Sequence, residues 1–200
     1  MKTQPAFRPA LTLLLAFTLL LGLGYPALIT ALAQAMFPFE ANGSIIMENN
    51  KAAGSELIGQ AFEGPGWFRP RPSATSVHPY NGALSGGSNL GPLNPALQTA
   101  AAERAQKLRA ENPASTGKVP VDLATASASG LDPHISPAAA FFQVDRVARE
   151  RGLSREAVQK LVAGSVEGRT FGILGEPRVN VLKLNLSLLR LTPKSPNKGQ

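Results

Sequence analysis

The sequence predicts one N-terminal transmembrane helix followed by one mixed α/β domain. Two observations lead to this fold class. No charged side chain occurs from Pro9 to Phe39, and beyond Glu40 segments of helical composition alternate with segments of strand composition. The predicted organisation is a cytoplasmic N-terminus at 1–9, a transmembrane helix at 10–36, a domain at 40–192 and a flexible tail at 193–200.

The uncharged stretch is long enough to be a membrane anchor. A helix crosses a bilayer with about 20 apolar residues, and this stretch exceeds that length. Lys2 and Arg8 precede it, whereas Glu40 is the first charge after it. Because basic flanks stay in the cytoplasm, the domain is predicted to face the periplasm or the exterior. Gly22, Gly24 and Pro26 predict an interruption against which neighbouring helices can pack.

A cleaved signal peptide is the alternative interpretation of the same stretch. Ala31-Leu32-Ala33 has the small-x-small pattern of a cleavage site, which would leave a chain beginning at Gln34. The apolar core of a signal peptide is about 7–15 residues, and this stretch is roughly twice as long. A retained anchor is therefore favoured, although both interpretations export the domain.

Composition excludes several classes of function. The chain has 20 Lys and Arg against 13 Asp and Glu, a net charge of +7, of which Lys2 and Arg8 supply two. The remaining +5 is scattered along the domain, so nucleic-acid binding is not indicated. The absence of cysteine excludes disulfides, thiolate metal sites and cysteine nucleophiles.

The first part of the domain is predicted to be poor in regular structure. A short strand is expected at residues 44–47, after a turn at Gly43, and a strand or single helical turn at 54–62. Residues 64–92 are dense in Gly, Pro, Ser and Asn and are expected to be irregular. So long a loop inside a compact domain is generally functional.

Helical signals begin with Asn94-Pro95, a capping residue followed by a proline, and strong helix formers then continue to Glu111. Residues 118–128 have the β-branched content of a strand and are predicted as one.

The last part of the domain is predicted to hold two helices and a strand. Ser136-Pro137 repeats the capping signal, and the helix that it begins is expected to run through Arg151 to a stop at Gly152. Ser154 caps another helix. Residues 178–191 alternate leucines with polar residues, which predicts a half-buried strand.

Catalytic and metal chemistry is weakly indicated. Asp132-Pro133-His134 could begin a metal site, but such a site needs three or four ligands, and a polar turn is favoured. Ser127 or Ser129 with His134 could form a hydrolase site. The G-x-S-x-G pattern of such sites is absent. An exported hydrolase or binding module unrelated to transport is the alternative from a different class.

A glycine-rich turn is the candidate nucleotide site. Its backbone amides could cradle a phosphate, and the Leu-Ser-Gly-Gly at its start resembles the nucleotide-sensing signature of ABC ATPases. It lacks the lysine of a P-loop. The alternative is a tight turn that leads into the helix at Asn94. The candidate nucleotide-binding residues are Ser85, Gly86, Gly87, Ser88 and Asn89.

Aromatic and arginine side chains gather in the irregular segment. They are Trp67, Phe68, Arg69, Arg71 and Tyr80. Protein interfaces favour such side chains. A small local core beneath a long loop is an equally good interpretation.

Seven segments spread over the chain, together with the anchor, resemble the C subunit of the bacterial Kdp-type potassium-transporting ATPases. The resemblance covers nearly the whole chain. The segments are Gly54-Ser55-Glu56-Leu57-Ile58-Gly59-Gln60, Arg71-Pro72-Ser73-Ala74, Tyr80-Asn81, Ser85-Gly86-Gly87-Ser88-Asn89-Leu90-Gly91-Pro92, Pro120-Val121-Asp122-Leu123, Ser129-Gly130-Leu131-Asp132-Pro133-His134-Ile135-Ser136-Pro137 and Gly175-Glu176-Pro177-Arg178-Val179-Asn180-Val181.

The resemblance implies a single-pass accessory subunit of the inner membrane that does not hydrolyse ATP itself. Its implied partners are a channel-like potassium-translocating subunit, a P-type ATPase subunit, a small single-helix subunit and membrane lipid, with no nucleic acid. The family is described as a catalytic chaperone that raises the affinity of the ATPase subunit for ATP. No cofactor is implied as tightly bound, and ATP would act through the complex. Residues 64–92 would dock on the potassium-translocating subunit, with Arg71, Tyr80 and Asn81 as contacts, and Trp67 stands where the family is expected to have tyrosine.

Overall fold

A computed structural model describes residues 6–191 and divides the chain into two compact units, residues 1–45 and 46–200. The predicted tail at 193–200 lies outside the described residues. The first unit is dominated by one continuous helix, Phe7–Met36, with a mean hydropathy of 2.0 in its most apolar window and no side chain of that window buried within the chain. At 1.5 Å per residue its 30 residues extend about 45 Å, which exceeds a hydrocarbon core of about 30 Å.

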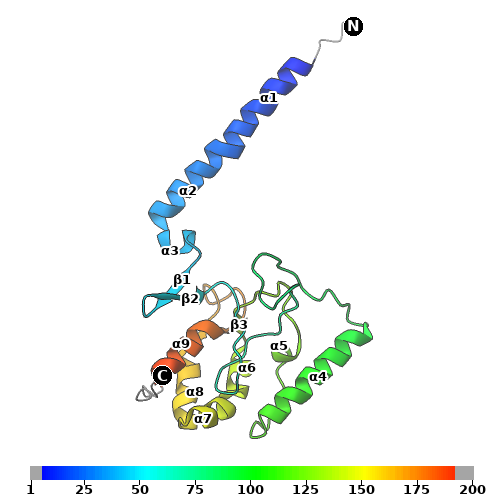
Figure 1. The fold of residues 1–200 in the computed structure, drawn as a ribbon, viewed down its shortest axis with the longest axis vertical. Helices are drawn as coiled ribbons and strands as arrows, with labels where there is room; N and C mark the ends of the chain where they lie inside the picture. The colour runs from blue at the N-terminus through cyan, green and yellow to red at the C-terminus, as the bar shows by residue number, and fades with distance from the viewer. Residues whose placement is uncertain (1–5, 192–200) are drawn as a thin grey trace, which may run out of the picture. The chain divides into compact units, whose positions relative to one another are not determined.

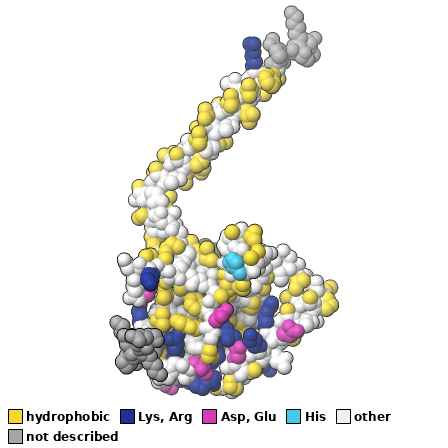
Figure 2. All heavy atoms as spheres, viewed as in Figure 1, with side chains coloured by type: hydrophobic (Ala, Val, Ile, Leu, Met, Phe, Trp, Pro, Cys, Tyr) yellow, Lys and Arg dark blue, Asp and Glu magenta, His cyan; other side chains and the backbone are white. Residues whose placement is uncertain are grey.

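The helix contains a π-helical turn at the predicted interruption. It consists of α1 (Phe7–Leu19), the π turn η1 (Leu20–Gly24) and α2 (Tyr25–Met36) (Figure 1). The Tyr25 N–H donates to the carbonyl of Leu20, five residues back. Pro26 has no N–H to offer the carbonyl four residues before it, which favours the wider turn. Apolar side chains cover the helix along its length in Figure 2, as a lipid-exposed helix requires.

The described strands form two small antiparallel sheets. After the short α3 (Pro38–Ala41), β1 (Ile45–Glu48) and β2 (Lys51–Ser55) pair as the first sheet, which confirms the strand predicted near 44–47. Beyond Ser55 the segment predicted to 62 has no further strand or helix. The second sheet has the order β3-β5-β4. Its strands are β3 (His134–Ile135), β4 (Val166–Glu167) and β5 (Arg178–Asn180).

The helix predicted from Pro95 is confirmed as α4 (Pro95–Glu111), and Asn94 caps it by accepting a hydrogen bond from the Ala96 N–H at 2.9 Å. In Figure 1 this helix lies beside the short helix α5 (Val121–Ala124). It buries one side chain, Leu108. Because Leu108 is its one buried side chain, the cap and the strong helix formers contribute a large share of the stability of α4.

The helix predicted from Pro137 to Arg151 is two helices. They are α6 (Pro137–Phe142) and α7 (Val144–Arg151), separated at Gln143, whose buried side chain bonds elsewhere in the domain. The predicted caps are confirmed, because Ser136 accepts from Ala139 N–H at 3.1 Å and the following helix α8 (Arg155–Gly164) is capped by Ser154. Gly152 ends α7 in the left-handed conformation.

The strand predicted at 118–128 is wrong. Residues Val121–Ala124 form the short helix α5 behind Pro120, and the remainder is irregular. Leu123 and Ala124 are buried while Val121 is 75% exposed. The β-branched residues therefore do not share one strand face, and one helical turn buries the adjacent Leu123 and Ala124 together.

The strand predicted at 178–191 is also wrong beyond Asn180. β5 ends there, and α9 (Val181–Leu191) follows. The Asn180 side chain begins the helix by accepting from the Lys183 N–H at 3.1 Å. The same segment also has the spacing i, i+3, i+4 and i+7 of one helix face, and all four residues of that face are buried. They are Val181, Leu184, Asn185 and Leu188.

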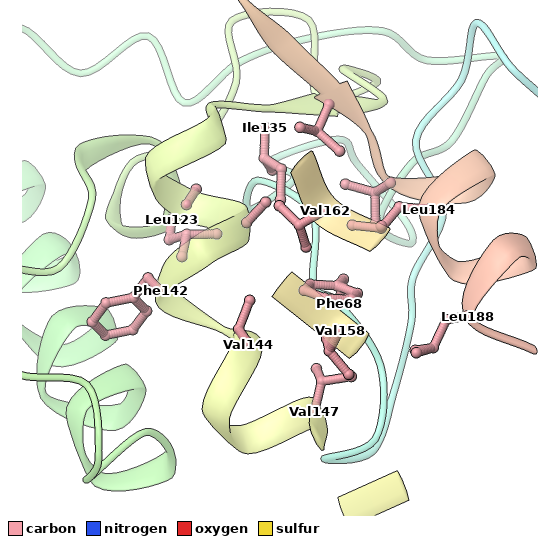
Figure 3. Close-up of a cluster of buried hydrophobic side chains, with 14 of the residues drawn as sticks. Phe68, Leu123, Ile135, Phe142, Val144, Val147, Val158, Val162, Leu184 and Leu188 are labelled. Atoms are coloured by element: carbon pink, nitrogen blue, oxygen red, sulfur yellow. The ribbon is translucent and has the colours of Figure 1, made fainter. Parts of the chain in front are cut away.

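The core lies between β5 and the helices α6 to α9, and a loop residue is buried within it. Phe68, from the irregular segment, is fully buried beside Val158, Val162 and Leu184 (Figure 3). Residues 64–92 contain no helix or strand, as predicted. The irregular segment is therefore fixed to the core through Phe68 rather than lying loosely on the surface.

Candidate functional site

A buried arginine on α7 fixes the start of the irregular segment. Arg146 is 1% exposed, and its guanidinium donates to the carbonyls of Pro65 and Trp67. It also donates to the side-chain oxygens of Gln143 at 2.7 Å and Asn112 at 3.1 Å. Burial lowers the pKa of Arg146 to about 10, so the side chain is still a cation at neutral pH. Four neutral oxygens thus solvate this cation in place of water.

Two buried amide side chains pair with the backbone of the same segment. Gln143 accepts from the Arg69 N–H at 2.8 Å and donates to its carbonyl at 3.1 Å. Asn185 does the same for Phe68, at 3.0 Å and 2.9 Å. Each amide side chain supplies one acceptor and one donor to the extended backbone. A neighbouring β-strand would otherwise satisfy these backbone groups. Residues 65–69, which Arg146, Gln143 and Asn185 hold, are called the clamped segment below.

Trp67, predicted at an interface, is partly buried by its own chain. The guanidinium of Arg151 lies 4.1 Å from the centre of its ring, and the Phe62 ring lies 5.7 Å away. Arg151 also donates to the Gly66 carbonyl at 2.7 Å. The indole therefore packs locally, as one of the two interpretations expects, and part of its surface stays accessible.

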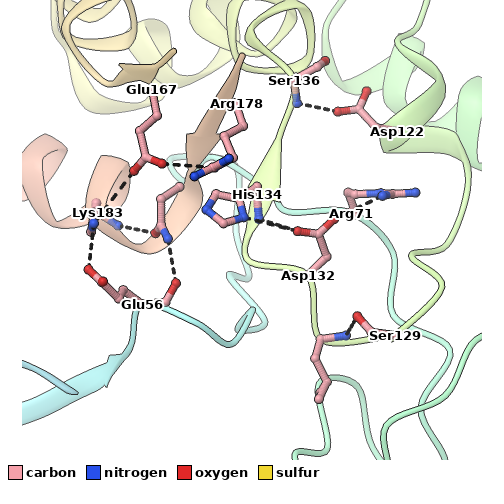
Figure 4. Close-up of polar contacts among 12 residues, drawn as sticks. Glu56, Arg71, Asp122, Ser129, Asp132, His134, Ser136, Glu167, Arg178 and Lys183 are labelled. Atoms are coloured by element: carbon pink, nitrogen blue, oxygen red, sulfur yellow. Dashed lines mark hydrogen bonds and ion pairs between the residues drawn. The ribbon is translucent and has the colours of Figure 1, made fainter. Parts of the chain in front are cut away.

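Arg71, also predicted at an interface, forms an ion pair with Asp132 at 3.1 Å and donates to the Ala126 carbonyl at 3.4 Å (Figure 4). The other carboxylate oxygen of Asp132 accepts from the His134 N–H at 3.0 Å. Burial alone would raise the pKa of Asp132, but the hydrogen bonds from His134 and Arg71 outweigh it and lower the pKa below its ordinary value. The Asp-Pro-His motif is therefore a turn that anchors Arg71.

Residues 73–81 form a compact loop that its own side chains stabilise, called the 73–81 loop below. The Ser73 hydroxyl donates to the Gly130 carbonyl at 2.7 Å and accepts from the Tyr80 N–H at 2.9 Å. The Thr75 hydroxyl donates to the His78 carbonyl at 2.7 Å. The Tyr80 hydroxyl donates to the Arg71 carbonyl at 2.6 Å. These bonds turn residues 76–79 outward, and all four are exposed.

The tip of the 73–81 loop is strained and apolar. Val77 is 89% exposed and adopts a left-handed backbone with φ of 71°, which is rare for a β-branched residue. Asn81, the fourth predicted interface residue, donates to the Ser76 carbonyl at 3.3 Å and accepts from the Ala83 N–H at 3.1 Å. Tyr80 and Asn81 thus shape the tip, and Val77 is its most exposed apolar side chain.

The glycine-rich turn lies against residues 127–130. The Gly86 N–H and the Ser85 hydroxyl both donate to the Ser129 carbonyl, at 2.9 Å and 3.0 Å. A Cβ atom on Gly87 would lie 2.6 Å from the Ala128 carbonyl oxygen, so this close approach requires glycine. Two donors of the predicted phosphate cradle therefore serve the fold, and Ser88 and Asn89 are exposed beyond them.

No described contact assembles the alternative hydrolase site. Between residues 6 and 191, no hydrogen bond joins His134 to Ser127 or Ser129. Ser127 is 3% exposed, and the Ser129 hydroxyl accepts from the Leu131 N–H at 3.1 Å. The same residues contain no cluster of three or more His, Asp or Glu side chains able to hold a metal ion.

A cleft of about 360 Å³ separates the irregular segment from α4. Its lining includes Arg69, Tyr80, Arg104 and Lys107. Arg69 pairs with Glu111 at 2.5 Å and Arg104 donates to the Ala124 carbonyl at 3.2 Å. Arg69 and Arg104 therefore already have partners within the domain, and these contacts hold α4 in place.

Sequence reasoning missed the residues that hold the clamped segment. Gln143 and Arg146 occur among the apolar positions Ala140, Val144 and Val147 of their helices, which places them on the buried face. A polar side chain on such a face signals a buried hydrogen-bond partner. One partner of Arg146 is the Pro65 carbonyl, 81 residues away. The sequence could therefore indicate that Arg146 has a buried hydrogen-bond partner, but not which residue it is.

Alkaline pH should weaken the support that Tyr80 gives to the 73–81 loop. Burial, with a smaller contribution from Asp132, raises the pKa of Tyr80 from 10.0 to about 12. The unfolded chain therefore ionises first, so this stabilisation is complete below about pH 10 and is lost as the pH rises toward 12. We expect the difference in unfolding free energy between wild type and Tyr80→Phe to shrink over that range. Guanidinium unfolding followed by Trp67 fluorescence measures it, and a constant difference would contradict the expectation.

The fold and the site together define a class of protein. It has one helix long and apolar enough to span a membrane, followed by a mixed helix and sheet domain in which Arg146 and Arg151 bond to the backbone of an irregular segment. The chain belongs to the KdpC family, the C chain of the K⁺-transporting ATPase, whose family model matches residues 7–190.

Curated relatives carry the same family name. The chain is 59% identical over 182 residues to the potassium-transporting ATPase KdpC subunit of Methylococcus capsulatus, covering 91% of this chain and 96% of the relative. It is 58% identical over 186 residues to the KdpC subunit of Polaromonas naphthalenivorans, covering 93% and 95%. The resemblance stated from the sequence motifs is thereby confirmed.

Proposed function

We propose that this chain is a non-catalytic accessory subunit of a high-affinity, ATP-driven potassium uptake complex in the bacterial inner membrane. Its role is to assemble and stabilise the complex and to raise the affinity of the P-type ATPase subunit for ATP. The observation that carries the proposal is the family match, which begins in the apolar helix and continues to residue 190. The other partners are a channel-like potassium-translocating subunit and a small single-helix subunit.

Two observations support a retained anchor. The family match includes the helix from residue 7, and the backbone remains helical through the predicted cleavage site, where the Phe37 N–H donates to the Ala33 carbonyl at 2.8 Å. Processing proteases act preferentially on exposed, irregular backbone. The cations Lys2 and Arg8 support a cytoplasmic N-terminus, which directs the domain to the periplasm.

Docking on the potassium-translocating subunit is assigned to residues 64–92. Trp67, Arg71, Tyr80 and Asn81 act as positioning residues, because their described contacts hold this surface in shape. The exposed residues 76–79 then make the contact, with Val77 as the apolar centre. A surface fixed before binding loses little conformational entropy when it docks, which favours a stable complex.

The effect on ATP affinity is assigned to a change transmitted through the membrane subunits. ATP is cytoplasmic, whereas the proposed domain is periplasmic. Ser85 and Gly86 already donate to Ser129, so a direct phosphate contact would rely on the amides of Gly87, Ser88 and Asn89. The chain therefore needs no tightly bound cofactor of its own.

One preparation tests the proposal: the full chain carrying a C-terminal tag, expressed with the neighbouring transport genes. Protease added to spheroplasts should digest the domain and leave the anchor.

Mild solubilisation should co-isolate a potassium-translocating subunit, a P-type ATPase and a small peptide. Complex prepared without this chain should show a raised KM for ATP, while the isolated full chain should show no saturable ATP binding at millimolar ATP.

Each outcome has a defined opposite. A protected domain in spheroplasts would contradict the orientation, and a chain released by osmotic shock would contradict the anchor. Saturable ATP binding by the isolated chain, weakened by substitution of Ser88 and Asn89, would replace the transmitted effect by direct contact. Isolation without any transport subunit would contradict the function itself.

A further inference from the structure

A ten-residue hairpin projects from the second sheet without packing on the domain. Residues 168–177 connect β4 to β5, and every one of them is exposed. Thr170 and Leu174 exchange two backbone hydrogen bonds of 2.9 Å, and the Gly172 N–H donates to the Arg169 carbonyl at 3.0 Å. The hairpin, called the 168–177 finger below, is therefore preformed.

The tip of the 168–177 finger is apolar. Phe171 is 87% exposed, Ile173 75% and Leu174 56%. Phe171 also adopts a left-handed backbone, with φ of 55°, between the bridge partners. An exposed aromatic side chain on a strained backbone stabilises nothing within the chain, and such strain concentrates at recognition sites.

The charged side chains of the finger and its base pair with one another, so this region is electrically neutral. Arg169 pairs with Glu176 at 2.7 Å, and Arg178 pairs with Glu167 at 3.1 Å. Figure 4 shows the second pair joined to Lys183, which also contacts Glu56 at 2.7 Å. The finger continues into β5, where Val179 is fully buried. Its direction is thus set by the core of the domain.

This charge pattern decides between the two occupants that could cover the tip. Loops that enter the interface of anionic lipid combine an apolar tip with unpaired cations that contact the headgroups. Here each cation of the finger and its base has a carboxylate partner. A defined apolar shape without free charge fits a hydrophobic pocket in another protein.

We propose that the 168–177 finger inserts Phe171 and Ile173 into an uncharged, apolar pocket on another subunit of the same transport complex. This inference rests on the proposed function, because it requires those subunits. It adds a second contact that is separate in sequence from residues 64–92. Two separated contacts would fix the orientation of the domain, which a single tethering helix cannot do.

The absence of native cysteine allows a direct test in the full chain. Ile173→Cys, labelled with an environment-sensitive nitrobenzoxadiazole dye, is expressed in native membranes with and without the other subunits. We expect the dye to shift to shorter emission wavelength and its quenching by iodide to fall at least fivefold only when the other subunits are present. Lys160→Cys, at an exposed position of α8, is the matched control and should remain accessible in both preparations.

Other results would overturn the proposal. Shielding of the dye in membranes that contain this chain alone, with quenching by spin-labelled lipid, would assign the tip to the bilayer. Full accessibility in the assembled complex would show that nothing covers it.

A second variant separates this inference from the proposed function. Phe171→Ser with Ile173→Ser should lower recovery of the transport subunits at least tenfold while the thermal midpoint of the domain stays unchanged, because neither side chain packs on it. Equal recovery by wild type and variant would contradict the proposed contact of the 168–177 finger and leave the proposed function intact. Failure of the wild-type chain to recover any subunit would contradict the proposed function.

Discussion

Replacing Arg146 by methionine should destabilise the domain by about 2–4 kcal/mol. Methionine fills much of the same volume but offers no donor. The partly buried carbonyls of Pro65 and Trp67 would then lose the guanidinium that serves them. A buried acceptor left unpaired costs about 1–3 kcal/mol. The side-chain oxygen of Asn112, which is buried, would lose its one described partner, whereas that of Gln143 would keep the Arg69 N–H.

The measurement is guanidinium unfolding of the full chain in detergent, followed by the fluorescence of Trp67, the only tryptophan. Arg149→Met is the matched control, because Arg149 lies on the same helix with 54% of its side chain exposed and pairs only with Glu150 at the surface. We expect that control to stay within about 1 kcal/mol of wild type. An Arg146→Met protein as stable as the control would show that the clamped segment does not depend on the buried cation.

Local signals in the sequence were sufficient for the parts of the fold that local physics determines. The apolar helix follows from length and absence of charge, and α4 follows from the Asn94 cap and its strong helix formers. The irregular character of residues 64–92 follows from their Gly and Pro content. None of these features requires a distant partner, which is why composition and capping were enough.

The incorrect predictions concern segments whose secondary structure is determined by contacts with distant residues. In α9, leucines at alternate positions satisfy a strand pattern, but Val181, Leu184 and Leu188 satisfy a helical pattern equally well. Asn185 resolves the ambiguity only in the folded state, where its buried amide pairs with Phe68. In α5 the β-branched residues indicated a strand, yet none of the strands between residues 6 and 191 pairs with this segment.

That Trp67, Arg71, Tyr80 and Asn81 form an interface stays a prediction, and the sequence did not indicate the bonds that they make. Trp67, Arg71, Tyr80 and Asn81 do lie on one continuous irregular segment, yet their described bonds run inward. The most exposed apolar residues near them, and on the 168–177 finger, are Val77 and Phe171. Neither was identified, because isolated apolar residues in a loop carry no periodicity from which exposure could be predicted.

Asn185→Leu should destabilise the domain by about 2–4 kcal/mol, even though it places an apolar residue in an apolar core. Both the N–H and the carbonyl of Phe68 would lose their only described partner while remaining buried. Two unpaired backbone groups at about 1–3 kcal/mol each outweigh the gain from burying a leucine side chain. Ser187→Ala, on the same helix, is the control and should change stability by no more than about 0.5 kcal/mol. Unfolding midpoints followed by Trp67 fluorescence give both values.

The double variant Arg146→Met with Asn185→Leu tests whether the two side chains hold one structural unit. Both act on the clamped segment, Arg146 through Trp67 and Asn185 through Phe68, which are adjacent in the chain. Once either support is lost, the segment can detach and hydrate its backbone, so the second substitution should cost less than it does alone. We expect the summed effects to exceed the double-variant effect by about 0.5–3 kcal/mol, as found for residues that share a network. Strict additivity would mean that the segment is held at independent points, and that the docking surface beyond it does not depend on the clamp as a unit.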